Sequence, residues 1–174
     1  VEVSEGTDVY FGLDLELAQN NIYALSYVYP SGPTRMHTSP DGGSSWVSQE
    51  LVSWSSHTGE PGMCVYREGY DDVVLVASGA AGLLRSTDSG ATFWKVSDLP
   101  TVEPGFGWRF MAVGTNASWF GTPADSDIYV IGSRNYYDYG GWIGGGFALT
   151  FTKSSDNGLT WSTPVRICES NHDT

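Results

Sequence analysis

Short hydrophobic runs recur along the chain, each bounded by Gly, Pro, Asn, Asp or Ser. Three of them, at residues 21–25, 72–76 and 127–131, begin with an Asn or Asp. Runs of this length between turn-forming residues are typical of β-strands, because a helix needs a longer segment with a period of about 3.6 residues. The pattern therefore predicts one equivalent strand in each of three repeats.

The segments around these runs also repeat and supply three more strands in each repeat. First strands are predicted at 9–15, 63–68 and 109–114, third strands at 34–38, 82–86 and 147–153, and fourth strands at 45–52, 92–96 and 160–167. Twelve strands without a helical segment predict an all-β chain. We expect three four-stranded antiparallel units, at about residues 8–55, 62–100 and 107–168.

One octapeptide pattern lies between the third and fourth strands of every repeat. Residues 39–46, 86–93 and 154–161 align without a gap as S-x-D-x-G-x-[S/T]-[W/F]. An Asp carboxylate and Ser/Thr hydroxyls can bond backbone N–H groups across a turn, Gly permits positive φ, and the aromatic ring can pack on the sheet. The pattern predicts a fastened hairpin without a catalytic role, built from Ser39, Asp41, Gly43 and Trp46, from Ser86, Asp88, Gly90 and Phe93, and from Ser154, Asp156, Gly158 and Trp161.

The octapeptide resembles the Asp box of sialidases, which also occurs in xyloglucan-cleaving glycosidases and in sortilin-type receptor propellers. The resemblance implies a β-propeller whose repeats are four-stranded blades. Propellers close with roughly four to eight blades, so three blades predict half of a six-bladed ring or a fragment of a longer propeller. The two outer sheet faces of such an unclosed segment must then be covered by another structure. We expect a second copy in a homodimer or polymer, or the remainder of a longer chain, and an unstable lone monomer.

The strand order predicts which loops share one end of the sheets. Box turns lie at one end. The crossings between repeats and the loops between second and third strands lie at the other, where the resemblance to sialidases implies an active site. That end collects aromatic side chains, which with carboxylates suit a neutral glycan. Packing against a neighbouring blade or chain is the alternative. The ligand-binding candidates are Trp54, His57, Trp108, Tyr136, Tyr139 and Trp142.

Catalytic groups are predicted only weakly. Glycoside hydrolysis uses paired carboxyl groups, and a sialidase uses a Tyr nucleophile with an acid/base Asp and three arginines. The carboxyl and phenol candidates are Glu60, Glu103, Asp138 and Tyr137. The sialidase-type Arg-Ile-Pro signature is absent, and Arg67, Arg109 and Arg134 are the remaining arginine candidates.

These observations favour a non-catalytic propeller segment that acts in assembly or glycan recognition. The first alternative is half or a fragment of a glycoside hydrolase, sialidase-like or xyloglucanase-like, whose other catalytic groups lie in further sequence. A receptor-type propeller that binds peptides is the second alternative.

Composition narrows the range of partners and locations. The formal net charge is -12, with only 8 Lys plus Arg and no basic run, which argues against nucleic acid. The apolar runs are strand-sized, so we expect no membrane span. The chain begins without Met or a leader pattern, as a processed or trimmed product would. Asn116-Ala117-Ser118 is an N-glycosylation acceptor, which predicts a secreted, extracellular glycoprotein.

Cysteines and oxygen-rich turns complete the candidate chemistry. We expect Cys64 and Cys168 to be two buried free thiols, with a single disulfide as the alternative. The pairs Asp71-Asp72 and Asp125/Asp127 could contribute to a Ca²⁺ site, although Asx turns explain them without an ion. The three histidines lack the spacing of zinc ligands. No cofactor is therefore expected.

Overall fold

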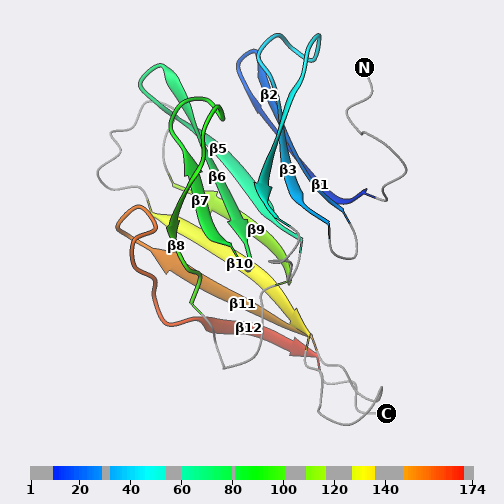
Figure 1. Cartoon of the computed structure of the whole chain (residues 1–174). Helices are drawn as coiled ribbons and strands as arrows, with labels where there is room; N and C mark the ends of the chain where they lie inside the picture. The colour runs from blue at the N-terminus through cyan, green and yellow to red at the C-terminus, as the bar shows by residue number, and fades with distance from the viewer. Residues whose placement is uncertain are drawn as a thin grey trace.

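The computed structural model describes residues 10–28, 32–53, 60–79, 81–100, 109–116, 127–135 and 147–170, with the backbone alone at 10–13, 109–110, 134–135, 147–148 and 169–170. This part of the chain forms β-strands and contains no helix, and so none that could cross a membrane (Figure 1). The strands are β1 (Tyr10–Ala18), β2 (Asn21–Val28), β3 (Thr34–Ser39), β4 (Val47–Val52), β5 (Gly62–Glu68), β6 (Asp71–Ser78), β7 (Gly82–Ser86), β8 (Trp94–Ser97), β9 (Arg109–Thr115), β10 (Ile128–Asn135), β11 (Phe147–Ser154) and β12 (Val165–Ser170).

The strands pair into three four-stranded antiparallel sheets, each a simple meander in chain order. Sheet A contains β1 to β4, sheet B contains β5 to β8, and sheet C contains β9 to β12. The all-β class is confirmed, and a strand lies at each of the twelve predicted places. Figure 1 shows sheet A in blue and cyan, sheet B in green and sheet C from yellow-green to red.

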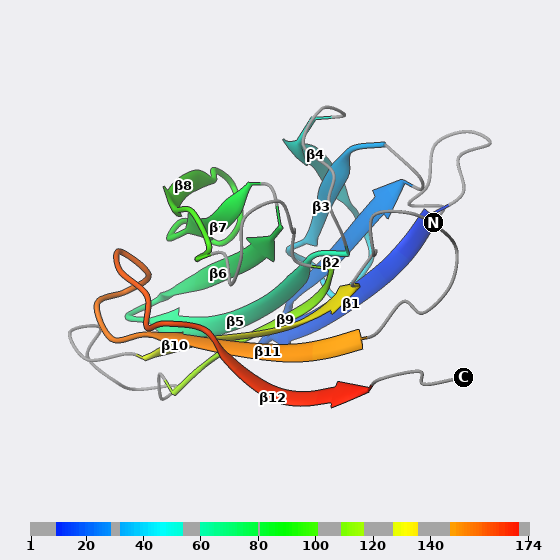
Figure 2. The same cartoon turned by 90° about the horizontal axis from the view of Figure 1, so that it is seen from below.

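The three sheets pack in the order A, B, C. Strands β1, β5 and β9 lie side by side along the stack, as Figure 2 shows from below. One hydrophobic core lies between sheets A and B and a second lies between sheets B and C. Sheet B is therefore covered on both faces, which explains why Val73–Ala77 of β6 is an unbroken apolar run in which every residue is buried.

Each sheet has two faces that need separate names. We call the face turned toward the preceding sheet in the chain the leading face and the opposite one the trailing face. In β2, Tyr23 and Leu25 lie on the trailing face and join the core with sheet B, while Ile22 and Ala24 alternate onto the leading face. Within the described residues, no sheet covers the leading face of sheet A or the trailing face of sheet C.

The fourth strand of every sheet begins later than predicted. β4, β8 and β12 begin at Val47, Trp94 and Val165. The N–H of Ser45, Thr92 or Thr160 donates to the box aspartate, so this residue belongs to the turn. In sheet C, Ser162 still bonds to Lys153 of β11 before the regular pairing of β12 begins. Each of the three strands then has a register shift at the same place, which leaves Leu51, Val96 and Ile167 outside the paired positions. The three repeats are therefore structurally equivalent down to the bulge in the fourth strand.

The prediction of two buried thiols is wrong for one of them. Cys64 on β5 is buried and Cys168 on β12 is exposed, and both are free. They lie in different sheets, and Cys168 pairs in register with Leu149 on the trailing face of sheet C. A periodic pattern cannot reveal that this face has no following sheet in the described chain.

Candidate functional site

The three Asp boxes share one hydrogen-bond pattern at one end of the sheets. In sheet B, Ser86 Oγ donates to Asp88 Oδ1 at 2.7 Å and accepts the N–H of Gly90 at 2.9 Å. Asp88 also accepts the N–H and the hydroxyl of Thr92 at 2.9 and 2.6 Å. The same bonds recur in the other two boxes, with φ of 93°, 80° and 88° at Gly43, Gly90 and Gly158.

These bonds favour the ionised aspartate. The Thr92 hydroxyl and N–H lower the pKa of Asp88 to about 2, and the equivalent Thr160 groups lower the pKa of Asp156 to about 2. The Ser45 hydroxyl and N–H lower the pKa of Asp41 in the same way. A carboxylate held in this way is a hairpin fastener and a poor proton donor at neutral pH.

Of the predicted site residues at the other end of the sheets, the structure describes Glu60. Trp54, His57, Glu103, Trp108, Tyr136, Tyr137, Asp138, Tyr139 and Trp142 lie outside the described residues. The prediction that these side chains gather into one site stays a prediction.

Glu60 lies where the three sheets meet. It immediately precedes sheet B, its Oε1 accepts the hydroxyl of Tyr27 from sheet A at 3.1 Å, and its carbonyl accepts the N–H of Met111 from sheet C at 3.0 Å. Tyr27 is buried and Glu60 is half-buried. The carboxylate is thus positioned by contacts that no single repeat contains.

The arginine candidates do not join Glu60 among the described side chains. Arg67 lies at the box end of β5, where its Nη2 donates to the Tyr70 carbonyl at 3.1 Å and its Nε lies 4.0 Å from Asp72 Oδ1. The opposite end of the same strand follows Glu60, so a site that contains both is excluded. Arg109 and Arg134 belong to β9 and β10, and their side chains lie outside the described residues.

Sequence patterns did not single out two carboxylates on β1, Asp14 and Glu16. Both lie on the trailing face of sheet A, and Asp14 Oδ2 accepts the N–H of Met63 from sheet B at 2.7 Å. Burial, with Asp14 nearby, raises the pKa of Glu16. Burial, with Glu16 and Asp14 nearby, raises the pKa of the Cys64 thiol to about 12, so this thiol is a poor nucleophile at neutral pH. The first strand was predicted to end at residue 15, so only Asp14 of these two carboxylates lay within a predicted strand.

His37 on the leading face of sheet A is held between two hydroxyls. Its Nε2 lies 2.8 Å from Ser26 Oγ and its Nδ1 lies 2.7 Å from Ser48 Oγ. Burial, and then the Arg35 cation, lower its pKa. Both ring nitrogens bond to hydroxyls and neither bonds to a carboxylate, so the histidine lacks the orienting acid of a hydrolytic triad.

The structure also explains the oxygen-rich turns through protein contacts. Asp72 Oδ2 accepts the Tyr23 hydroxyl at 2.8 Å and the Asn21 amide at 2.7 Å, and Lys153 Nζ lies 2.6 Å from Asp127 Oδ2. Among the described residues no group of three or more His, Cys, Asp or Glu side chains is arranged to hold a metal ion. Asp125 lies outside these residues, and a contribution to a Ca²⁺ site stays a prediction.

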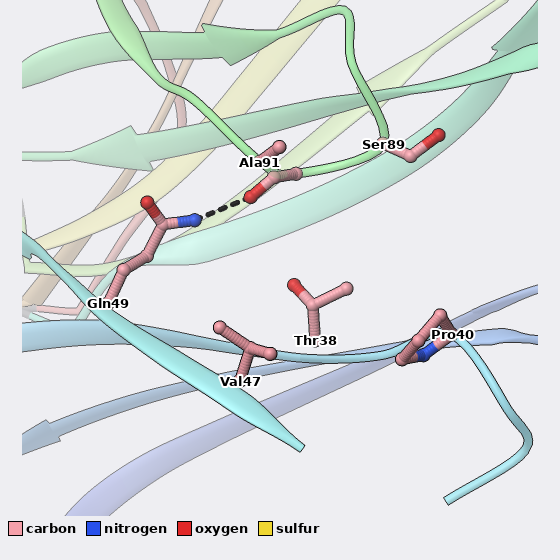
Figure 3. A pocket seen from close by; sticks show the side chains of 7 residues that line it. Thr38, Pro40, Val47, Gln49, Ser89 and Ala91 are labelled. Carbon is pink, nitrogen blue, oxygen red and sulfur yellow. Dashed lines mark hydrogen bonds between the residues drawn. The ribbon is translucent and has the colours of Figure 1, made fainter. Parts of the chain in front are cut away.

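A cleft of about 360 Å³ separates the box of sheet B from the outer strands of sheet A. Its lining consists of Thr38, Pro40, Val47, Gln49, Ser89, Gly90 and Ala91. Figure 3 shows the Gln49 side chain reaching across it, where its amide donates to the Gly90 carbonyl. None of the lining side chains titrates, so the cleft offers packing and hydrogen bonds but no acid–base chemistry.

No protein-family model matches the chain, and neither a curated protein nor a solved structure matches it. The function is therefore argued from the geometry of this chain.

Proposed function

We propose that the chain is a non-catalytic Asp-box propeller segment that functions by assembling with further sheets of its own kind. The contrast between the two faces of the outer sheets carries this proposal. Leu15 and Leu17 on the leading face of sheet A are 59% and 61% exposed, and Val165 and Ile167 on β12 of sheet C are 58% and 55% exposed. Contiguous apolar side chains on a sheet face mark an interaction surface.

Three features support the non-catalytic part of the proposal. The box aspartates are hydrogen-bonded within their hairpins, the Cys64 thiol is buried, and Arg67 lies at the opposite end of the sheet from Glu60. Arg85 Nη2 likewise lies 3.2 Å from Glu68 Oε2 at the box end. The Ser26 and Ser48 hydroxyls contact His37, but no carboxylate orients this histidine, so the described side chains provide no complete Ser–His–acid triad.

The assembly state tests the proposal. Because a three-sheet stack exposes apolar side chains on both outer faces, we expect sedimentation velocity to show a dimer or larger species whose fraction rises with protein concentration. Unfolding should be followed over the same concentrations, and the melting temperature should rise with them. A folded monomer with a concentration-independent melting temperature contradicts the assembly function.

Glycan recognition at the end that carries Glu60 is the second candidate. The observation that favours it is the position of this half-buried carboxylate beside the Tyr27 hydroxyl, at the end where the predicted aromatic residues fall. Carboxylates that bond sugar hydroxyls beside aromatic rings are the usual composition of a carbohydrate site.

A glycan array tests this candidate with the wild-type assembly, with Trp142→Ala and with Glu60→Gln. We expect wild type to bind and both variants to lose at least tenfold in affinity, while Tyr70→Ala, altered at an exposed turn, binds like wild type. Binding to peptides but not to glycans contradicts it. Hydrolysis of a fluorogenic sialoside or of xyloglucan that Glu60→Gln abolishes would instead establish the hydrolase alternative.

A further inference from the structure

The Asp boxes of sheets B and C each dock on the sheet before them. Gln49 from sheet A donates to the Gly90 carbonyl in the box of sheet B, and Ser97 Oγ from sheet B donates to the Gly158 carbonyl in the box of sheet C. The Trp161 indole in turn donates to Ser97 Oγ at 2.9 Å. The Ser97 hydroxyl thus stands between the aromatic ring and the glycine carbonyl of the docked box.

The box of sheet A makes a different contact at the same place. Trp46 Nε1 donates directly to the Gly43 carbonyl of its own hairpin at 3.2 Å. Trp46 and Gly43 occupy the positions of Trp161 and Gly158 in the octapeptide. In sheet C, Ser97 of the preceding sheet lies between the indole N–H and the glycine carbonyl. In sheet A, the equivalent indole N–H and glycine carbonyl bond directly to each other.

The inner strands show the same contrast. Val113 on β9 pairs with Val130 and is 8% exposed beneath sheet B, whereas Leu15 holds the equivalent register position on β1, opposite Ala24, and is 59% exposed. The leading face of sheet A therefore exposes an apolar position whose equivalent on the leading face of sheet C is buried.

The trailing face of sheet C presents the other half of the contact. Ile167 lies at the bulge of β12, where β8 has Val96, and Val96 packs against the core between sheets B and C. Cys168 follows the bulge and pairs with Leu149, as Ser97 follows its bulge and pairs with Leu83. Cys168 is therefore the structural counterpart of Ser97 and is exposed.

We propose that a second copy of this chain binds head to tail, with its leading face of sheet A on the trailing face of sheet C of the first copy. Trp46 and Gly43 of one copy then contact Cys168 of the other, as Trp161 and Gly158 contact Ser97. A thiol is a weak donor and acceptor and can take the place of the hydroxyl. The occupant is this chain itself because its two outer faces carry both halves of the contact between sheets B and C.

The contact is heterologous, since two different faces of the chain meet. Two copies with both contacts made form a closed ring of six sheets, and a geometry that does not close produces a longer polymer. This inference rests on the proposed assembly function and adds the identity and orientation of the partner.

Two variants that each alter one face test the orientation. Trp46→Ala changes the leading face and leaves the trailing face intact, and Ile167→Asp does the reverse. Tyr70→Ala is the control, because Tyr70 is 95% exposed in the turn between β5 and β6 and belongs to neither face. Sedimentation velocity measures association, and far-UV circular dichroism checks that each variant keeps its β-structure.

We expect each face variant alone to weaken association at least tenfold and the control to associate like wild type. An equimolar mixture of the two face variants should form a one-to-one heterodimer, because the intact trailing face of one meets the intact leading face of the other. Ile167→Asp that still dimerises at wild-type strength, or a mixture that stays monomeric, overturns the head-to-tail contact.

Thiol labelling provides a second readout with the wild-type chain. Cys168 should react slowly with a maleimide in the assembly and at least tenfold faster after dilution to the monomer, whereas buried Cys64 should react slowly in both states. Cys168→Ser identifies the labelled site. Equal labelling rates of Cys168 in the assembly and the monomer overturn the head-to-tail contact. A wild-type chain that never associates overturns the proposed assembly function as well, and the open faces must then be covered by sheets other than those of a second copy.

Discussion

At the scale of single residues, the first serine of each Asp box holds the turn together from inside. Ser86 is fully buried, and its hydroxyl both donates to Asp88 and accepts from the N–H of Gly90. Gly90 is also buried, so this N–H depends on the serine for its hydrogen bond. The aspartate is the more conspicuous residue in the motif, but the serine is the more enclosed one.

Ser86→Ala should therefore destabilise the chain by about 1–3 kcal/mol, because it leaves the buried N–H of Gly90 without an acceptor. Thr87→Ala is the matched control, since Thr87 is the exposed neighbour in the same hairpin and its removal should change stability by less than about 0.5 kcal/mol. Urea denaturation of both variants at one protein concentration measures the difference. Equal midpoints would show that the box serine has no role in stability.

Residue types predicted the bonds inside the boxes because those bonds are local. The contacts of Glu60 with Tyr27 and Met111 were not predictable, because they join residues from three different sheets. The same holds for Cys168: whether a strand residue is buried depends on whether another sheet follows, which the period of the strand cannot reveal.

At the scale of elements, the packing of sheet B on sheet C requires close approach of two backbones. A Cβ placed on Gly62, at the start of β5, would lie 2.2 Å from the Met111 carbonyl oxygen on β9. Glycine is thus needed at this position for space rather than for an unusual φ.

Gly62→Ala should lower the melting temperature, because β9 must move away and the core between sheets B and C loses contact; overpacking of this kind typically costs about 1–3 kcal/mol. Gly114→Ala is the control, since a Cβ on Gly114 meets no atom within 4 Å. Thermal unfolding followed by circular dichroism compares the two. A Gly62→Ala protein as stable as Gly114→Ala would contradict the close packing of β5 on β9.

Strand positions were predictable from hydrophobic runs, and the errors concentrate at the fourth strands. The box aspartate takes the backbone N–H of Ser45, Thr92 or Thr160, so these residues join the turn although their neighbours look strand-like. Side-chain competition for backbone donors is invisible to periodicity.

At the scale of the whole molecule, the repeat pattern predicted three equivalent units, and the structure shows that they have unequal surroundings. Sheet B is enclosed, and sheets A and C each expose one apolar face. The sequence indicated that something must cover these faces. The hydrogen bond of Trp46 to its own hairpin, which distinguishes the box of sheet A from the box of sheet C, could not be predicted from the sequence.

Because the boxes of sheets B and C dock on the sheet before them, the order in which the sheets are synthesised matters for folding. During synthesis sheet A emerges first, and when the box of sheet B emerges, the Gln49 amide that bonds it is already present. Sheet C in turn finds Ser97 in place. Growth from the N-terminus thus supplies the boxes of sheets B and C with the side chains on which they dock. In the head-to-tail assembly proposed above, the box of sheet A would dock only after another chain has completed its last strand.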